Sequence, residues 1–316
     1  MPKVSVIIPI YNVASYIERC ACSLFEQTLD DMEFIFVDDA SPDDSIQILQ
    51  ETLSLFPQRK SQVHIIHHSS NLGLTAARNS GLEMATGSFV AYCDSDDYVA
   101  SNMYKLLYEK AIQEKADVIY CDFFMIYSSR NEYYSTLNEH KDKTVFLKQY
   151  LLQGWNVLWN MIISRKLLLT NHLYSPNGIS FCEDFHLSVR VLFYADRILK
   201  VNKALYYYNR VNVSSIVHSL YEKKKENDER KTYLDTIDFF DKNGVLTDFK
   251  KEMSWRILKN KQDLLLNPLQ HQEFMKIYPE SHKHIMSCPV SFCNRKMKCF
   301  MSVSYTHLRA HETLRH

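Results

Sequence analysis

The sequence lacks the glycine patterns that hold nucleotide phosphates in two common classes of enzyme. Its 316 residues include only six glycines, at positions 73, 81, 87, 154, 178 and 244. No GxGxxG follows the first apolar run and no GxxxxGK[ST] occurs, which argues against a Rossmann dinucleotide enzyme and a P-loop enzyme. A chain that binds a diphosphate without a glycine cradle needs another device. A divalent cation held by carboxylates is one such device.

The sequence also lacks a net charge, a long hydrophobic run and paired CxxC units. Lys+Arg and Asp+Glu both number 37, so charge gives no argument for a nucleic-acid partner, and acidic residues exceed basic ones in the first hundred residues. No run approaches about 18 apolar residues, and the N-terminal run is too short for a signal peptide. We expect a cytoplasmic protein. The eight cysteines are predicted to be reduced and mostly buried, rather than a zinc or disulfide framework.

Apolar segments of strand length alternate with amphipathic segments over the first 125 residues. Strands are predicted at 4–10, 33–37, 63–67, 88–93 and 117–124. Helices are predicted at 15–26, after an N-cap at Ser41, from about 75 to a stop at Gly87, and at 102–115. This alternation is typical of a parallel sheet covered on both faces.

The alternation weakens after about residue 130. Segments 155–169, 181–195 and 204–211 are interpreted as strand or helix pieces of an α+β extension. Two amphipathic helices are predicted at 219–241, closed by Gly244, and at 247–266, ending before Pro268. Residues 301–316 show no apolar periodicity and are interpreted as a disordered or non-native tail.

Carboxylates follow two of the predicted strands. Asp38 and Asp39 follow the strand at 33–37, and "DSDD" at 94–97 follows the strand at 88–93. Ligands of open α/β sheets bind outside the carboxyl ends of the strands, so both groups should lie at the binding edge. Like charges this close repel and normally need a cation. The alternatives are a turn or helix-cap role for Asp38 and a solvated acidic turn at 94–97.

Five motifs occur in the order and approximate spacing of family 2 glycosyltransferases: "VSVIIPIYN", "FVDDAS", "NLGLTAARNSGL", "CDSDD" and "CEDFHL". The chain resembles these nucleotide-sugar enzymes over about residues 3–215. The resemblance implies an α/β fold of GT-A type, with a mostly parallel, Rossmann-like sheet flanked by helices. It implies a nucleotide-sugar half at about 1–125, an acceptor half at about 126–215 and a helical C-terminal extension at 216–300.

The resemblance implies a nucleotide pocket in the first half. Pro9 and Tyr11 would line the base pocket, with the ring of Tyr11 on uracil, and Asp39 would accept a hydrogen bond from base or ribose. Arg78 would lie near the nucleotide. The alternatives are ordinary loop packing for Tyr11 and, for Arg78, an ion pair with Asp94 or Asp39 that holds loops together.

The resemblance also implies a metal site and a catalytic base. Asp94 and Asp96 match the DxD pair of the family, with Asp97 an additional ligand, and Mg²⁺ or Mn²⁺ suits oxygen ligands. Asp184 matches the base and Glu183 its neighbour, which predicts single displacement with inversion. Their apolar neighbours should raise the pKa of such a base. An exposed Glu-Asp pair at a helix start is the alternative.

The segment at 206–219 resembles the part of the family that folds over the diphosphate. Arg210, Ser214, Ser215 and His218 are the predicted phosphate contacts. Many relatives have a lysine where this chain has Met161, which puts a phosphate contact there in doubt. Trp155 and Trp159 face either the acceptor or the core.

These inferences predict an inverting, metal-dependent transferase that moves a monosaccharide from a UDP-sugar to an acceptor hydroxyl. The acceptor would be a glycan or lipid-linked acceptor in cell-surface polysaccharide or lipopolysaccharide synthesis. The alternative is a nucleotide-sugar-binding protein without transferase activity. The basic, apolar C-terminal part, including 291–300, suggests peripheral contact with the inner face of the cell membrane, or a plain helical cap.

Overall fold

The computed structural model describes residues 1–152, 155–212 and 222–289, together with residues 291, 293, 298, 301 and 303. The chain divides into two compact units. The first comprises Met1–Leu147 and Trp155–Leu220, and the second comprises Lys148–Gly154 and Tyr221–His316.

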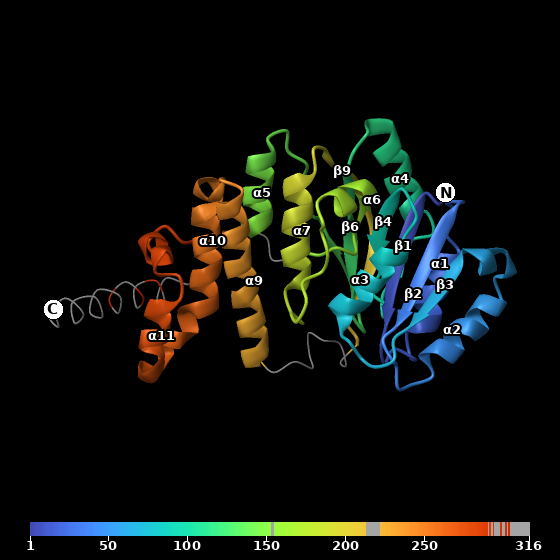
Figure 1. Cartoon of the computed structure of the whole chain (residues 1–316), viewed down its shortest axis with the longest axis horizontal. Coiled ribbons are helices and arrows are strands. Elements are labelled where there is room, and N and C mark those ends of the chain that lie inside the picture. The colour runs from blue at the N-terminus through green and yellow to red at the C-terminus, as the bar shows by residue number, and fades with distance from the viewer. Residues whose placement is uncertain are drawn as a thin grey trace. The chain divides into compact units, whose positions relative to one another are not determined.

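The described part of the first unit contains one nine-stranded sheet of order β3-β2-β1-β4-β8-β6-β9-β5, with β7 paired to β6 (Figure 1). Its first half is parallel, as predicted, because crossover connections that contain helices return each strand in the same direction. These strands are β1 (Val4–Ile10), β2 (Met32–Asp38), β3 (Val63–His67) and β4 (Phe89–Tyr92).

The second half of the sheet is mixed. β8 runs antiparallel to β4 and β6, whereas β9 runs parallel to β6 and antiparallel to β5. This half supplies the residues that pack behind the "DSDD" turn. Its strands are β5 (Tyr98–Val99), β6 (Val118–Ile126), β7 (Asn131–Tyr134), β8 (Met161–Ser164) and β9 (Ile198–Asn209).

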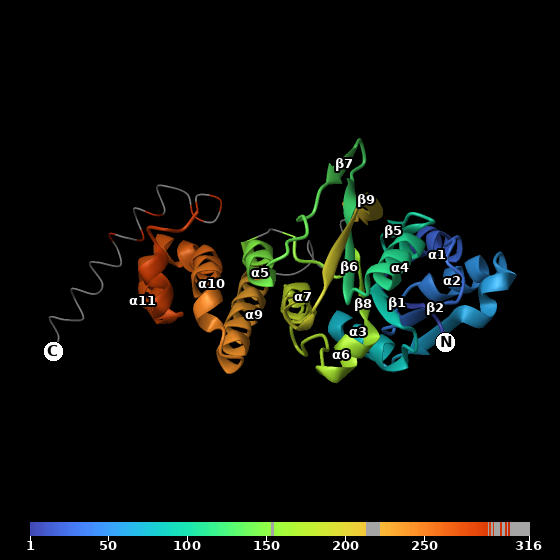
Figure 2. The same ribbon diagram turned by 90° about the horizontal axis from the view of Figure 1, so that it is seen from above.

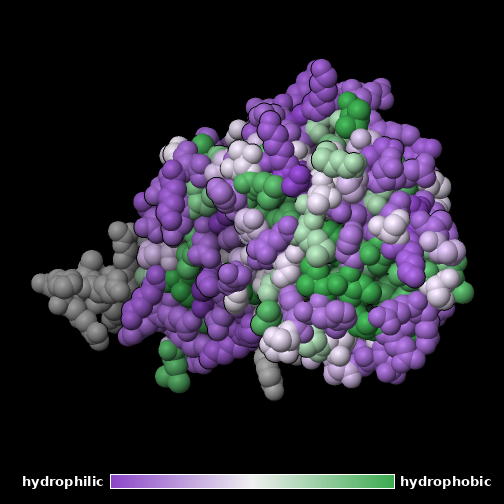
Figure 3. Space-filling view, turned by 45° about the vertical axis from the view of Figure 1, so that its right-hand side comes forward, coloured by the Kyte–Doolittle hydropathy of each residue, from purple (hydrophilic) through white to green (hydrophobic). Residues whose placement is uncertain are grey.

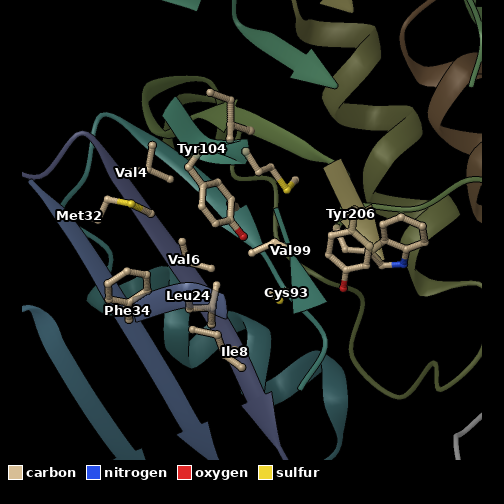
Figure 4. Close-up of a cluster of buried hydrophobic side chains, with 14 of the residues drawn as sticks. Val4, Val6, Ile8, Leu24, Met32, Phe34, Cys93, Val99, Tyr104 and Tyr206 are labelled. Carbon is tan, nitrogen blue, oxygen red and sulfur yellow. The ribbon is translucent and has the colours of Figure 1, made fainter. Parts of the chain in front are cut away.

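Helices cover both faces of this sheet, as the buried strands require. Val4, Val6 and Ile8 point into one core cluster with residues of α1 (Ile17–Phe25), α2 (Ser45–Ser54) and α4 (Met103–Glu114) (Figure 4). α3 (Leu74–Met84) and α6 (Arg165–Thr170) lie on the opposite face (Figure 2). There Gly81 allows α3 to approach Ile7, since a Cβ at this position would meet the Ile7 side chain at 2.4 Å.

The described part of the first unit also contains α7 (Glu183–Tyr194), the 3-10 turn Pro57–Gln62 and the start of α5 (Lys143–Leu152), whose last residues belong to the second unit. The second unit also contains α9 (Glu222–Lys242), α10 (Leu246–Lys261) and α11 (His271–Lys276), with 3-10 turns at Gln262–Leu266, Pro268–Gln270 and Pro279–His284. Trp255, Leu258, Leu265 and Phe274 form its core. Gly244, at φ +72°, follows α9, which confirms the predicted stop.

Two predicted helix ends are wrong. α2 begins at Ser45 rather than after Ser41, because the Ser41 side chain binds the neighbouring loop, and Asp43 binds both that loop and the Ser45 N–H, the latter at 3.2 Å. α3 ends at Met84, before Gly87. Gly87 is needed for a close approach, since a Cβ there would lie 2.7 Å from the Ser5 backbone nitrogen.

The face shown in Figure 3 is mostly hydrophilic, with apolar residues gathered on its right-hand half. None of the described helices is long and apolar enough to cross a membrane. Within the described part of the chain, seven cysteines are free, and five of them are buried, as predicted: Cys20, Cys93, Cys121, Cys288 and Cys293 are buried, and Cys22 and Cys182 are half-buried.

Candidate active site

The strand order places a binding edge at the carboxyl ends of β1, β2 and β4. β1 lies between β2 and β4, so the chain leaves it toward β2 and later returns on its other side as β4. This reversal is the point at which open α/β sheets bind ligands. The segments that follow these strands contain Tyr11, Asp38–Asp39 and Asp94–Asp97.

The loop after β1 is held by side chains from the loop after β2. The backbone N–H groups of Asn12 and Ala14 donate to Ser41 Oγ and Asp43 Oδ2, both at 2.8 Å. Pro9 is buried within β1, whereas Tyr11 is 48% exposed. The backbone is therefore fixed while the Tyr11 ring is accessible to a ligand such as a nucleobase.

Asp39 is buried, and both of its carboxylate oxygens have partners. Oδ1 accepts from the Leu72 N–H at 2.8 Å and contacts His68 Nδ1 at 2.7 Å, and Oδ2 accepts from the Gly73 N–H at 2.8 Å. The structure thus gives Asp39 a role in holding the segment that leads into α3. Its contact with a base or ribose stays a prediction.

Asp38 has a local role. Its Oδ1 accepts from the Ser41 N–H at 2.8 Å, and its Oδ2 contacts His67 Nδ1 at 2.9 Å. The turn role considered for Asp38 is confirmed.

The three aspartates after β4 differ in their surroundings. Asp94 has a 28% exposed side chain. Asp96 Oδ2 accepts from Asn212 Nδ2 at 2.7 Å. Asp97 is fully buried, and its oxygens accept from the Tyr206 hydroxyl at 2.6 Å and the Asn209 N–H at 2.7 Å. Asp94 and Asp96 are therefore the carboxylates that a ligand can share, and Asp97 holds the turn against β9.

The carboxylates of this turn lie close together and partly out of water, which disfavours their negative charges. Burial, together with the nearby charge of Asp94, raises the pKa of Asp96 to about 6. Burial and the nearby charges of Asp96 and Asp94 raise the pKa of Asp97 well above its usual value. A cation shared by Asp94 and Asp96 would relieve this repulsion.

Arg78, on α3, lies at the centre of an ion-pair cluster with 1% of its side chain exposed. Nη2 contacts Asp94 Oδ1 at 3.2 Å, and Nη1 contacts Glu183 Oε1 at 3.1 Å and Asp184 Oδ1 at 2.5 Å. Although burial acts in the opposite sense, these carboxylates raise the pKa of Arg78 and keep it charged. Of the two pairings considered for an Arg78 that holds loops together, the structure shows the one with Asp94.

Asp184 and Glu183 begin α7 behind a residue in the left-handed region, Cys182, at φ +67°. Their side chains are only 15% and 12% exposed, so the alternative of an exposed pair is wrong. Burial raises the pKa of Glu183 to about 8, with Asp184 adding to the shift and Arg78 opposing it. Burial also raises the pKa of Asp184, against the opposing charge of Arg78.

The donor set fits a cation that is shared with a ligand. Among the described residues, no group of three or more His, Cys, Asp or Glu side chains could hold a metal ion by itself. Mg²⁺ commonly binds through one or two carboxylates and takes its other ligands from water and substrate phosphates. Asp94 and Asp96 would hold it in this way.

The predicted phosphate contacts are only partly described. Arg210 follows β9, and its guanidinium carbon lies 5.6 Å from the centre of the Tyr208 ring. Ser214, Ser215 and His218 lie outside the described residues.

Two further positions belong to the core. Trp159 is 3% exposed and stacks on Tyr206 at 4.2 Å, which confirms core packing for this tryptophan, and Met161 is equally buried in β8.

The sequence analysis missed the residues that hold the "DSDD" turn from behind. Tyr206, Asn209 and Asn212 supply hydrogen bonds to Asp97 and Asp96. Arg19, on α1, donates to the Asp96 carbonyl oxygen at 3.3 Å. The polar residues of "YYYNRVN" at 206–212 were a signal, because Asn209, Arg210 and Asn212 come at and just after the aromatic end of β9.

Comparison with known proteins identifies the family. The family model "Glycosyl transferase family 2" matches residues 5–181, which include nearly all of β1, the strands β2 to β4, the "DSDD" turn and Arg78. The chain belongs to glycosyl transferase family 2. It is therefore a glycosyltransferase, and its predicted α/β fold of GT-A type is confirmed.

Relatives and solved structures agree with this assignment. The chain is 31% identical over 281 residues to the uncharacterized glycosyltransferase EpsJ of Bacillus subtilis, covering 84% of this chain and 78% of EpsJ. S. aureus TarS 1–349, solved in complex with UDP-GlcNAc, is similar in fold, with a TM-score of 0.70 at 20% identity over 98% of this chain and 92% of TarS. A mannosyltransferase from Pyrobaculum calidifontis, PcManGT, solved with GDP-Man and Mn²⁺, has a TM-score of 0.58 at 14% identity over 96% and 86%.

Proposed function

We propose that this family 2 glycosyltransferase uses a divalent cation to transfer a monosaccharide from a UDP-sugar to an acceptor hydroxyl, with inversion at the anomeric carbon. The observation that carries the proposal is the ion-pair cluster of Arg78, which joins Asp94 of the "DSDD" turn to Asp184 at the start of α7. Groups suited to hold a diphosphate and to accept a proton are thereby brought to one site.

The loop after β1 supports a nucleotide in this site. The accessible ring of Tyr11 offers a stacking face, while the loop backbone is fixed by Ser41 and Asp43. TarS was solved with UDP-GlcNAc and PcManGT with GDP-Man, so both uridine and guanosine donors deserve testing. The preference for UDP rests on the family resemblance of the Tyr11 and Asp39 positions.

The "DSDD" turn supports a role for Mg²⁺ or Mn²⁺. When bound, the cation would neutralise charge on the leaving diphosphate. Asp94 and Asp96 would hold it, and Asn212 orients Asp96 through its Oδ2. Asp97 is left out of this ligand set, since Tyr206 and Asn209 engage both of its oxygens.

Asp184 is the proposed base. It would accept the proton of the acceptor hydroxyl while the hydroxyl oxygen bonds to C1 of the sugar and UDP leaves with the electron pair of the broken bond. One displacement at C1 inverts its configuration. Arg78 and the Leu158 N–H, which donates to Asp184 Oδ2 at 3.3 Å, orient the carboxylate.

The acceptor is proposed to be a hydroxyl of a cell-surface glycan or a lipid-linked precursor, and this rests on family resemblance alone. Contact with the inner face of the membrane belongs to the same proposal. The basic segment at 291–300, which suggested it, lies mostly outside the described residues.

Calorimetric titration of the full chain with UDP and with GDP, each with and without Mn²⁺, tests the donor site. The proposal expects UDP binding that depends on Mn²⁺ in the wild type and is lost in Asp96→Asn. Asp44→Asn is a matched control, because Asp44 is exposed and its side chain makes no cap hydrogen bond to α2. Failure of the folded wild type to bind either nucleotide would refute the proposal. Equal binding of UDP with and without Mn²⁺ would refute the proposed role of the cation.

A further inference from the structure

The three carboxylates around Arg78 come from separate parts of the chain. Asp94 lies 16 positions after Arg78 and follows β4, whereas Glu183 and Asp184 lie 105 and 106 positions after it and begin α7. The two nitrogens of one guanidinium divide between them. Nη2 contacts the "DSDD" side, and Nη1 contacts the α7 side.

This division depends on the planar fork of arginine. A guanidinium presents several N–H groups in a fixed geometry and can hold acceptors on two sides at once, whereas an ammonium is a compact point charge. Since Arg78 is 1% exposed, water cannot readily replace it. The relative position of Asp94 and Asp184 therefore depends on this side chain.

Burial also keeps Arg78 from acting as an ordinary substrate contact. Both terminal nitrogens are engaged by carboxylates, and its guanidinium carbon lies 5.8 Å from the centre of the buried Tyr92 ring. The carboxylates that it contacts are the more accessible groups, with side chains 28%, 12% and 15% exposed for Asp94, Glu183 and Asp184. Any effect of Arg78 on the reaction must pass through them.

We infer that Arg78 is a positioning residue that couples the two halves of the active site, by setting the cation-binding carboxylate Asp94 and the base Asp184 in one arrangement. This inference rests on the proposed function. It adds that two properties, binding of the donor with its cation and transfer of the proton, both depend on Arg78. Replacing a residue that served only the donor side or only the base side would change one of these properties and leave the other unchanged.

The test uses Arg78→Lys and Arg78→Gln in the full chain. Lysine keeps the charge without the fork, and glutamine keeps short hydrogen-bonding groups without the charge. Two properties are measured for each variant. The first is the affinity for UDP in the presence of Mn²⁺, by calorimetry. The second is the rate of UDP release at saturating donor and Mn²⁺, with water as the acceptor and the UDP-sugar that the wild type hydrolyses fastest.

Both properties should change together in both variants. We expect UDP affinity with Mn²⁺ to fall at least about 10-fold, as is typical when a residue that orients metal ligands is replaced. The saturated rate of UDP release should fall about 100-fold, because misplacing a catalytic group by an ångström has an effect of that order.

Arg59→Lys is the matched control. Arg59 is also buried and also joins separate segments, since it donates to the carbonyl oxygens of Phe25 and Gln27. It lies in the 3-10 turn Pro57–Gln62, before β3 and therefore at the opposite end of that strand from the site. This control should lose stability, seen as a lower thermal midpoint, while UDP affinity and the saturated rate stay within about twofold of wild type.

Four outcomes would overturn the inference. Unchanged affinity and rate in Arg78→Lys and Arg78→Gln would show that the fork is dispensable. Loss of affinity alone would place Arg78 on the donor side only, and loss of rate alone would place it on the base side only. Equal losses in Arg59→Lys would assign the effect to general destabilisation. A folded wild type that neither binds UDP nor releases it would refute the proposed function itself.

Discussion

The substitution Asp39→Asn separates the structural role of this carboxylate from contact with a nucleotide. In the structure, its two oxygens face two different backbone donors, the N–H groups of Leu72 and Gly73, both at 2.8 Å. An asparagine side chain has one oxygen and one NH₂ group. In either orientation, one of these partly buried N–H groups therefore faces another donor.

The size of the effect follows from these contacts. An unsatisfied buried N–H costs about 1–3 kcal/mol, and each retained hydrogen bond loses about 1 kcal/mol when its acceptor is no longer charged. With two bonds retained, to one backbone N–H and to His68, and with the N–H groups only partly buried, the free energy of unfolding should fall by up to about 4 kcal/mol. For a unit of this size that corresponds to a decrease of about 10 °C in the thermal midpoint.

Urea unfolding and thermal unfolding of Asp39→Asn measure this loss, with UDP titration on the same samples. Asp38→Asn is the control. Its side-chain oxygen can still accept from the Ser41 N–H, and His67, the partner of the aspartate oxygen that is replaced, is 55% exposed. It should lose about 1 kcal/mol or less. An Asp39→Asn protein that is as stable as wild type but no longer binds UDP would refute the reasoning and assign Asp39 to the nucleotide.

Two further predictions concern the base and the second unit. Asp184→Asn should bind UDP with Mn²⁺ as wild type does, because Asp94 keeps its own contact with Arg78 Nη2 and the amide oxygen can still accept from Nη1. It should transfer sugar about 10²–10⁴-fold more slowly, measured as UDP release with acceptor, because an amide cannot accept the proton; near wild-type transfer would exclude Asp184 as the base. Burial lowers the pKa of Lys261 to about 7, with Arg230 adding to the shift and Glu280 opposing it, and its Nζ donates to the Ile277 carbonyl. Between pH 7 and 10 the unfolded chain then binds more protons at this lysine, so the free energy of unfolding should gain up to about 1.4 kcal/mol per pH unit from it. The difference in urea stability between wild type and Lys261→Met should follow that slope from pH 7 to 8, and a difference independent of pH would contradict it.

The elements of the first unit were largely predictable from local patterns. The strands at β1 to β4 are short apolar runs, and a sheet covered on both faces requires such runs. The start of α2 was not predictable in this way. Ser41 and Asp43 had the residue types of a helix start, but their side chains bind Asn12 and Ala14 from another loop. These partners lie 29 positions away in the sequence, so a local pattern could not show that they compete with the helix for the two side chains.

The candidate site was predictable as a set of residues but not as a set of roles. Asp94, Asp96, Asp97 and Asp184 were each chosen from motifs, and the structure keeps all four at or behind one edge of the sheet. It then distinguishes Asp97, which Tyr206 and Asn209 bind from a strand more than 100 positions away.

The sequence by itself determined the order of strands and helices and the placement of carboxylates after β2 and β4, because hydrophobic periodicity is local and parallel strands end at the same edge. Only the tertiary structure decided which carboxylates are engaged internally and which are open to a ligand. Asp39 and Asp97 satisfy their oxygens with donors from other segments, and Arg78 gathers Asp94, Glu183 and Asp184. The physical reason is that burial and hydrogen bonding of a charged group are set by whatever the fold brings to it, and those neighbours lie far away along the chain.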